Sequence, residues 1–166
     1  NPAIVKYWRD VENAARKCIT ERKTVVLRTK YTSLKFEYDR GYMFLTLPSG
    51  RRLAYYGAQV TGRKITYYGI DQTRKIWTKD DTYGGSLVES ITQAVARDCL
   101  TETMALMFDD VNIIFHVHDE IVAEEDDEIA DDVLRYMKEV MAISPAWGKG
   151  LPLSGEGYIS QYYKKD

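Results

Sequence analysis

Hydrophobic and polar residues repeat with two different periods along this chain, and these periods predict where its helices and strands lie. At the start, Asn1 and Pro2 suit the cap and the first position of a helix. The apolar residues that follow recur at spacings of three and four, which is typical of one helical face. They are Ile4, Trp8, Val11, Ala15 and Cys18. We therefore expect an amphipathic helix that packs through this face.

Strand patterns follow from about residue 24 to residue 79. Short runs of alternating or β-rich residues are separated by turn signals, of which Pro-Ser-Gly at residues 48–50 is the clearest. These runs predict antiparallel hairpins. They are residues 34–38, 42–47, 52–56, 65–68 and 75–78.

Basic residues lie among the aromatic residues of this strand-rich segment. Such interleaving can bind a nucleic-acid backbone and stack on its bases. Taken alone, it is more often found in an ordinary antiparallel sheet with one solvated face. The basic residues are Arg51, Arg52, Arg63, Lys64, Arg74 and Lys75.

The pattern of apolar residues changes from strand-like to helical near residue 83. A pair of glycines there precedes a long helical pattern over residues 86–108. Glu89, Gln93 and Arg97 lie four residues apart in it and form one polar stripe. The apolar residues beside this stripe predict the buried side of the helix. They are Val88, Ile91, Val95, Cys99 and Leu106.

A third helix is predicted after an acidic run at residues 126–128. Negative charges are favourable near the N-terminus of a helix, so this run indicates a helix start rather than a metal-binding cluster. The tail contains a further strand candidate, the aromatic residues 158–163. The apolar stripe of the third helix consists of Ile129, Val133, Met137, Val140 and Met141.

The residues best suited to catalysis or metal binding are 116–120, His-Val-His-Asp-Glu. They lie between the apolar runs 111–115 and 121–123. Two β-rich runs separated by a few polar residues predict a hairpin with its chemistry at the turn. The adjacent carboxylates Asp119 and Glu120 can face one hard cation, because Mg²⁺ takes oxygen ligands and keeps several waters. The alternative for this segment is a solvated acidic turn without a ligand.

Composition narrows the class of protein. The 166 residues, 45% hydrophobic and 29% charged, are ordinary for one soluble domain or a piece of one. The net charge of −2 argues against a generally basic nucleic-acid binder, although local patches remain open. Cys18 and Cys99 lie far apart without a CxxC pattern, which indicates reduced thiols and a cytoplasmic protein. No apolar run reaches the length of a membrane span, so we expect no membrane partner.

Two segments together resemble the family A DNA polymerases, most closely the phage type. Residues 82–98 read TYGGSLVESITQAVARD and residues 116–120 read HVHDE, and this pairing at this separation is specific. Further resemblance makes the match cover nearly the whole chain. It lies in residues 8–15, 47–53, 150–153 and 155–157.

The resemblance implies roles for particular residues. Asp119 corresponds to the catalytic palm aspartate that binds two divalent ions, and Glu120 to the accompanying carboxylate, a weaker ligand. His118 corresponds to a residue that contacts or orients the primer-terminal backbone. Gln93 matches the glutamine that reaches the minor-groove side of the template-primer, and Arg97, one turn further, supports it.

The resemblance also implies a fold, partners and an incompleteness. The fold class is α+β: an antiparallel palm sheet with long packed helices, preceded by a helix and β-hairpins. Residues 1–83 correspond to the remainder of the fingers and 84–166 to the palm portion with the catalytic hairpin. The implied partners are template-primer DNA, deoxynucleotide triphosphates and two Mg²⁺, for which Mn²⁺ can substitute.

The family's other catalytic aspartate and its nucleotide-binding Lys, Tyr and Arg have no match in residues 1–166. We therefore expect a C-terminal piece that needs an upstream polymerase segment and has negligible activity alone. An exposed edge of the palm sheet would also favour self-association of the piece.

Two other functional classes use some of the same residues. A non-catalytic DNA-binding fragment, or one subunit of a split polymerase, fits the same residues. A His-Xaa-His metalloenzyme would use the strand face shared by His116, His118 and Glu120. However, two histidines exclude a three-histidine site, and neither Glu120 nor Glu124 has the spacing of a cupin-like ligand set.

Overall fold

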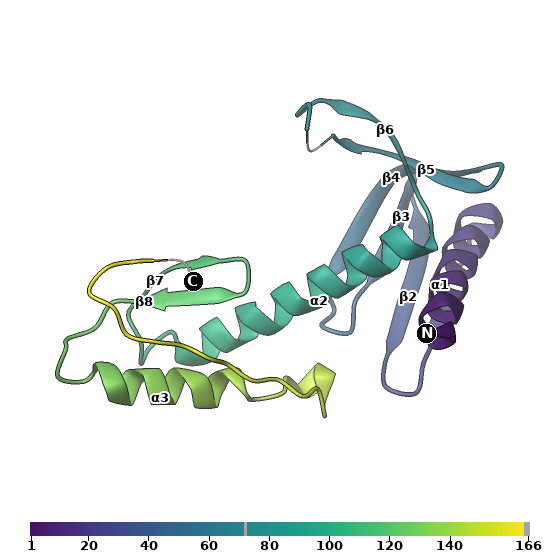
Figure 1. Ribbon diagram of the computed structural model, residues 1–166. Helices are drawn as coiled ribbons and strands as arrows, with labels where there is room; N and C mark the ends of the chain where they lie inside the picture. The colour runs from purple at the N-terminus through teal and green to yellow at the C-terminus, as the bar shows by residue number, and fades with distance from the viewer. Residues whose placement is uncertain (72, 165–166) are drawn as a thin grey trace. The chain divides into compact units, whose positions relative to one another are not determined.

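The computed structural model describes residues 1–71 and 73–164, and it confirms the α+β class (Figure 1). The chain divides into two compact units, Asn1–Val95 and Ala96–Asp166. The division falls inside the long helix α2 (Gly84–Met107), whereas the change from strand-like to helical sequence pattern lies near residue 83. The assignment of the two parts to fingers and palm stays a prediction. None of the helices in the described part of the chain is long and apolar enough to cross a membrane.

The first unit contains α1 (Pro2–Glu21), a six-stranded antiparallel sheet and the beginning of α2. Each strand of the sheet pairs with the next one along the chain, in the order β1-β2-β3-β4-β5-β6. The predicted hairpins therefore belong to one continuous sheet. Its strands are β1 (Val25–Arg28), β2 (Ser33–Asp39), β3 (Tyr42–Thr46), β4 (Arg52–Thr61), β5 (Lys64–Ile70) and β6 (Trp77–Thr82).

Helix α1 begins as predicted, because the side chain of Asn1 accepts a hydrogen bond from the backbone N–H of Ala3 at 3.0 Å. Its buried side is shifted from the prediction. Ile4 and Trp8 are 50% and 39% exposed, so the expectation that they face the core is wrong. The fully buried residues come from the later turns of the helix and are Val11, Ala14, Ala15, Cys18 and Ile19, while Tyr7 packs against this core partly buried.

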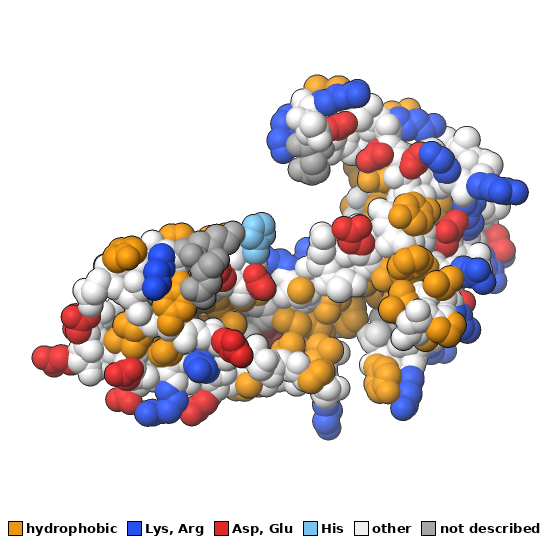
Figure 2. Space-filling model, in the orientation of Figure 1, with side chains coloured by type: hydrophobic (Ala, Val, Ile, Leu, Met, Phe, Trp, Pro, Cys, Tyr) orange, Lys and Arg blue, Asp and Glu red, His pale blue; other side chains and the backbone are white. Residues whose placement is uncertain are grey.

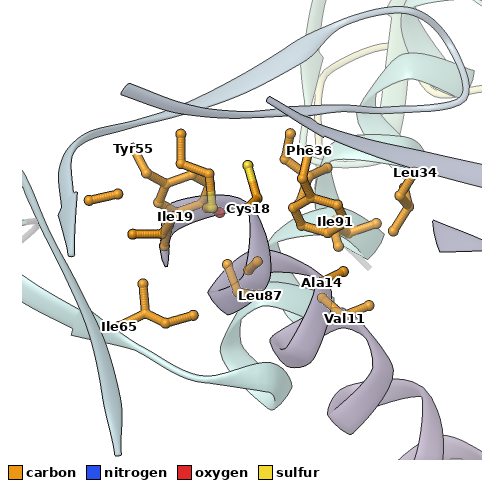
Figure 3. Packing of buried hydrophobic residues seen from close by; sticks show 14 of the residues in the cluster. Val11, Ala14, Cys18, Ile19, Leu34, Phe36, Tyr55, Ile65, Leu87 and Ile91 are labelled. Atoms are coloured by element: carbon orange, nitrogen blue, oxygen red, sulfur yellow. The ribbon is translucent and has the colours of Figure 1, made fainter. Parts of the chain in front are cut away.

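The core of the first unit lies between one face of the sheet and the two helices. Figure 3 shows Cys18 of α1 and Ile91 of α2 in the same cluster as Phe36 of β2. Alternation along each strand places every second side chain on this face. The fully buried members from the strands are Leu34, Phe36, Met43, Leu45 and Ile65.

A β-bulge in β4 changes which side chains of that strand point inward. The register with β5 shifts between Tyr56 and Gln59, and Gly57 has φ +61°. Because Gly57 is an extra residue, Ala58 returns to the buried face at 1% exposure instead of pointing outward. A methyl group on Gly57 would lie 2.9 Å from Cδ2 of Tyr68, so the ring of Tyr68 lies close against the bulge.

A polar network joins α1 to two distant parts of the first unit. Glu12 accepts hydrogen bonds from the backbone N–H of Gly84 at 2.9 Å and from Nε of Arg16 at 2.8 Å. Arg16 in turn donates to the carbonyls of Gly62 and Arg63 in the β4–β5 turn. The carboxylate of Glu12 thus satisfies a backbone donor at the first turn of α2, where helices have unpaired N–H groups.

The second unit contains the rest of α2, the hairpin of β7 (Ile113–Val117) and β8 (Glu120–Ala123), α3 (Ala130–Met141) and the short helix η1 (Ala146–Gly148). Its core is centred on Met107, Val111 and Val140. The predicted stripes of the long helices are partly wrong. Leu106 is 52% exposed and Ile129 precedes α3 at 45% exposure.

These differences have a physical reason. Helix α2 has apolar residues on neighbouring lines, and the partner elements decide which line is buried. The buried residues of α2 are Gly84, Leu87, Ile91, Ala94, Leu100, Thr103 and Met107.

Candidate functional site at the β7–β8 turn

The hairpin predicted around the His-Asp-Glu segment is confirmed, and its turn is as short as antiparallel strands allow. Val117 pairs with Glu120, which leaves His118 and Asp119 to connect β7 and β8. His118 has φ 52°, in the left-handed region that tight two-residue turns require. Because non-glycine residues adopt this conformation at a cost, the hairpin holds the His118 backbone in a fixed, strained geometry.

The side chains of His118, Asp119 and Glu120 are exposed at this turn. Figure 2 shows the histidine colour beside red carboxylates at the tip of the hairpin in the second unit. Adjacent exposed carboxylates present oxygen ligands without the cost of burying charge. The turn can therefore offer two carboxylates to a cation or to a substrate that approaches from solvent.

These carboxylates fit only part of a two-ion centre. Among residues 1–71 and 73–164, no group of three or more His, Cys, Asp or Glu side chains is arranged to hold a metal ion. His118 lies in the turn rather than in a strand, so it does not continue the face of His116 as the metalloenzyme alternative assumed. The donor set suits Mg²⁺ by its chemistry, but two carboxylates are fewer than a two-ion centre needs.

Arg97 and His116 are brought together, which the sequence did not indicate. Nη1 of Arg97 lies 3.0 Å from Nδ1 of His116, and Nη2 lies 3.0 Å from Nε2. A neutral imidazole has one acceptor nitrogen, so the guanidinium donates to only one of the two at a time. This contact fixes α2 against β7 next to the turn, and it gives His116 a structural partner.

The C-terminal segment covers one side of the hairpin. The ring of Tyr163 meets the ring of Phe115 edge-on, with centroids 5.1 Å apart, and its hydroxyl lies 3.5 Å from Oε2 of Glu120. The predicted strand at residues 158–163 is wrong, because this segment has no regular secondary structure. Its aromatic residues were the only signal in the sequence for a contact near the site.

The base of the hairpin is fixed by polar contacts. The backbone N–H of Asn112 donates to Oε1 of Glu125 at 2.7 Å, and the Asn112 side chain donates to the carbonyl of Glu124 at 3.0 Å. Nearby, the hydroxyl of Tyr136 donates to Asp110 at 2.8 Å, and this hydrogen bond, with burial and the negative charge of Asp110, raises the pKa of Tyr136. The Asn112 contacts join the two ends of the hairpin, and the Tyr136 contact joins α3 to the loop before β7.

Gln93 lies in the first unit, where it lines an open groove of about 370 Å³. Its amide nitrogen is 3.4 Å from Oε1 of Glu89, which also belongs to the predicted polar stripe. Aromatic and apolar side chains complete the groove, so a polar stripe borders a hydrophobic floor. The lining residues are Trp8, Tyr83, Gly85, Val88, Glu89, Thr92 and Gln93.

Comparison with known proteins gives one close relative. A DNA polymerase of Bacillus phage SP02 is 43% identical to this chain over 172 positions, which include the whole chain. The aligned region is 26% of that polymerase, so the chain spans about a quarter of its relative's length. No protein-family model matches the chain, and no solved structure matches it.

Proposed function

The chain is homologous over its whole length to a phage DNA polymerase, and from this relationship we propose that it is the C-terminal region of a family A DNA polymerase. The observation that carries the proposal is the exposed Asp119–Glu120 pair at a two-residue turn. Residues 1–83 would belong to the fingers side and residues 84–166 to the palm. In the complete enzyme this region would take part in DNA replication inside the infected cell.

The reaction is template-directed nucleotidyl transfer. The primer 3′-hydroxyl oxygen forms a bond to the α-phosphorus of a deoxynucleotide triphosphate, and the bond to the leaving pyrophosphate breaks. Two Mg²⁺ ions supply stabilisation of the attacking and leaving oxygens when bound. Asp119 would hold these ions and Glu120 would support it as a weaker ligand, since both carboxylates are exposed at the turn.

The neighbouring residues would position the nucleic acid. His118, whose backbone is fixed by the tight turn, would orient the primer-terminal backbone. Gln93 would reach the minor-groove side of the template-primer from the polar stripe of α2. Arg97 would act indirectly, because its guanidinium already contacts His116 and so supports the strand that leads into the turn.

The proposal requires an upstream segment. Asp119 and Glu120 provide too few carboxylates for two ions, and the described residues contain no group of three or more ligand side chains. The missing catalytic aspartate and nucleotide-binding residues would come from the part of the polymerase that precedes this region. We therefore expect negligible primer extension by the 166-residue chain alone.

A chimera tests the proposal. In the phage SP02 polymerase, the aligned quarter is replaced by this chain, and Mg²⁺-dependent primer extension is measured. Asp119→Asn should reduce extension by more than about 100-fold, because the change removes the negatively charged oxygen ligand that would hold the Mg²⁺ ions. The matched control is Asp109→Asn, an identical change at an exposed position outside the turn, which should leave extension within about twofold. Equal activity of the two variants would contradict the assignment of Asp119.

A second candidate function is a non-catalytic DNA-binding fragment or one subunit of a split polymerase. The incomplete carboxylate set favours it over an independent enzyme. Mixing the chain with the upstream segment of its own polymerase distinguishes these cases. Extension only in the mixture supports a subunit of a reconstitutable polymerase, and DNA binding without extension supports the non-catalytic fragment. Primer extension by the chain alone would contradict both the split-polymerase subunit and the non-catalytic fragment.

A further inference from the structure

A row of aromatic rings crosses the face of the six-stranded sheet that points away from α1 and α2. Ring centroids of Tyr42 and Tyr56 are 4.9 Å apart, those of Tyr56 and Tyr68 6.3 Å, and those of Tyr56 and Trp77 6.1 Å. Phe44 extends the row, since it stacks on Tyr42 at 5.4 Å with planes 14° apart. We call these five residues the aromatic row. It spans β3, β4, β5 and β6.

The sequence neighbours of these residues show that the row lies on the outer face. Met43, between Tyr42 and Phe44, is completely buried, and Tyr55, next to Tyr56, is 8% exposed. Tyr67, next to Tyr68, meets Tyr55 edge-on at 5.1 Å on the inner face. The core helices therefore do not cover the aromatic row.

The rings of the row remain accessible. Tyr56 is 42% exposed, Tyr68 39% and Trp77 60%, and the adjacent Ile70 is 59% exposed. Cross-strand aromatic pairs can stabilise a sheet by themselves. However, that role is best served when the rings are buried, and these rings leave large surfaces in water. An accessible series of flat rings is the arrangement on which nucleic-acid bases stack.

Basic residues flank the aromatic row. The guanidinium of Arg52 lies 4.4 Å from the ring centre of Phe44, and Lys79 is the register partner of Tyr68. Arg74 and Lys75 lie at the β5–β6 turn, where Figure 2 shows basic and hydrophobic side chains side by side. The same face carries the acidic residues Glu37 and Asp39. Lys35 forms an ion pair with Glu37 at 2.8 Å, which reduces the negative charge that a phosphate backbone would meet.

We propose that the aromatic row is a second nucleic-acid site, which binds single-stranded DNA by stacking bases on Tyr42, Tyr56, Tyr68 and Trp77 while Arg52 and Lys79 contact phosphates. Neighbouring rings are 4.9–6.3 Å apart, wider than the rise of about 3.4 Å between stacked bases along one strand of duplex DNA. The row therefore suits an unstacked, extended strand. Every base has a flat face, so the binding should tolerate any sequence.

This site is separate from the β7–β8 turn and lies in the other compact unit. It rests on the proposed function only for the source of the strand, because a polymerase template ahead of the primer is single-stranded. Binding itself requires neither nucleotide nor metal. A chimera without primer extension but with intact strand binding would contradict the proposed function and leave this inference standing.

The test is fluorescence anisotropy of the 166-residue chain with a labelled oligothymidylate of about 15 nucleotides, compared with an abasic strand of equal phosphate number. Stacking predicts at least about fivefold tighter binding of the strand with bases. Tyr56→Ala should weaken oligothymidylate binding by at least about fivefold, whereas Tyr56→Phe, which keeps the ring, should stay within about twofold. Lys79→Ala should reduce the steepness of the plot of log affinity against log salt concentration by about one unit, which corresponds to the loss of one phosphate contact.

The matched control is Tyr162→Ala, which removes a tyrosine that is 71% exposed in the second unit and should leave binding unchanged. Equal binding of the abasic strand would overturn the proposal and favour a protein partner for the row. Equal losses in Tyr56→Ala and Tyr162→Ala would overturn it as well.

A measurement on the unaltered chain guards against variants that fail to fold. On irradiation, a strand that contains 5-iodouracil should form crosslinks to residues of the aromatic row. Crosslinks found only in the second unit would refute the site.

Discussion

Two neighbouring glycines at the start of α2 should respond to the same substitution in opposite directions. A Cβ atom added to Gly84 would lie 2.2 Å from the carbonyl oxygen of Trp8 and 2.8 Å from its carbon, both in the backbone of α1. A Cβ added to Gly85 would lie 2.7 Å from Cε2 of Tyr83, a side chain that is 59% exposed. The first obstacle is the backbone of a packed helix, and the second is a ring that can rotate away.

The magnitudes follow from these contacts. Replacing glycine with alanine in a helix gains about 1 kcal/mol from propensity alone. At Gly84, a carbon-to-oxygen contact of about 3.3 Å requires the two helices to separate by about 1 Å, and such overpacking costs about 1–3 kcal/mol. The same movement stretches the 2.9 Å hydrogen bond from Gly84 to Glu12, whose loss costs a further ~1.5–3 kcal/mol. We expect Gly84→Ala to destabilise the first unit by about 2–4 kcal/mol and Gly85→Ala to stabilise it by up to about 1 kcal/mol.

Urea unfolding monitored by tryptophan fluorescence and far-ultraviolet circular dichroism measures both effects, and Trp8 reports directly on the contact. Gly84→Ala should lower the midpoint of unfolding and Gly85→Ala should leave it equal or higher, with unchanged slopes. An unfolding midpoint of Gly84→Ala at or above that of the unaltered chain would refute the close approach of α1 and α2. An equal loss in both variants would refute the distinction between backbone and side-chain obstacles.

Three further predictions concern other parts of the molecule. Burial, with a smaller contribution from Glu37, raises the pKa of Cys18 from 9.0 to about 11. The folded state therefore holds this proton more tightly than the unfolded state, so the stabilisation is complete below pH 9 and is lost as the pH rises to about 11. Because Cys18→Ala removes the titrating thiol, its urea midpoint should fall less at alkaline pH than that of the unaltered chain. An equal fall in both proteins would contradict this origin. Trp147→Phe removes the indole N–H that donates to Oε2 of Glu102 at 2.5 Å and should cost about 1–2 kcal/mol in urea unfolding, more than Tyr136→Phe, whose exposed hydroxyl bonds to Asp110. Within the described residues β7 and β8 pair only with each other, so we expect concentration-dependent self-association in analytical ultracentrifugation, which a monomer at all concentrations would exclude.

The features that the sequence predicted correctly are local ones. The Asn1 cap depends on residues two positions apart, and the hairpin around residues 116–120 depends on two flanking apolar runs, although only the folded chain shows that its turn is His118 and Asp119 alone. The His-Asp-Glu residues also stood out because their chemistry is unusual for a turn. In each case a short stretch of chain contains all the interactions that decide the structure.

The features that were missed depend on distant partners. The predicted hairpins did not indicate one six-stranded sheet, since nothing within a hairpin specifies its outer neighbours. Gly57 gives no sign that it is a bulge rather than an ordinary strand residue. The contact of Arg97 with His116 and that of Tyr163 with Phe115 join residues 19 or more positions apart, so only the folded chain shows them.

The network around Glu12 and Arg16 also affects how the chain folds as it leaves the ribosome. Arg16 is synthesised 46 residues before Gly62, and Glu12 is synthesised 72 residues before Gly84. The hydrogen bonds of Glu12 and Arg16 can therefore be completed only after the β4–β5 turn and the start of α2 have been synthesised. Contacts so distant in sequence are made slowly, because the long intervening segment must first be ordered. Completion of this network is therefore expected to be a late step in the folding of the first unit.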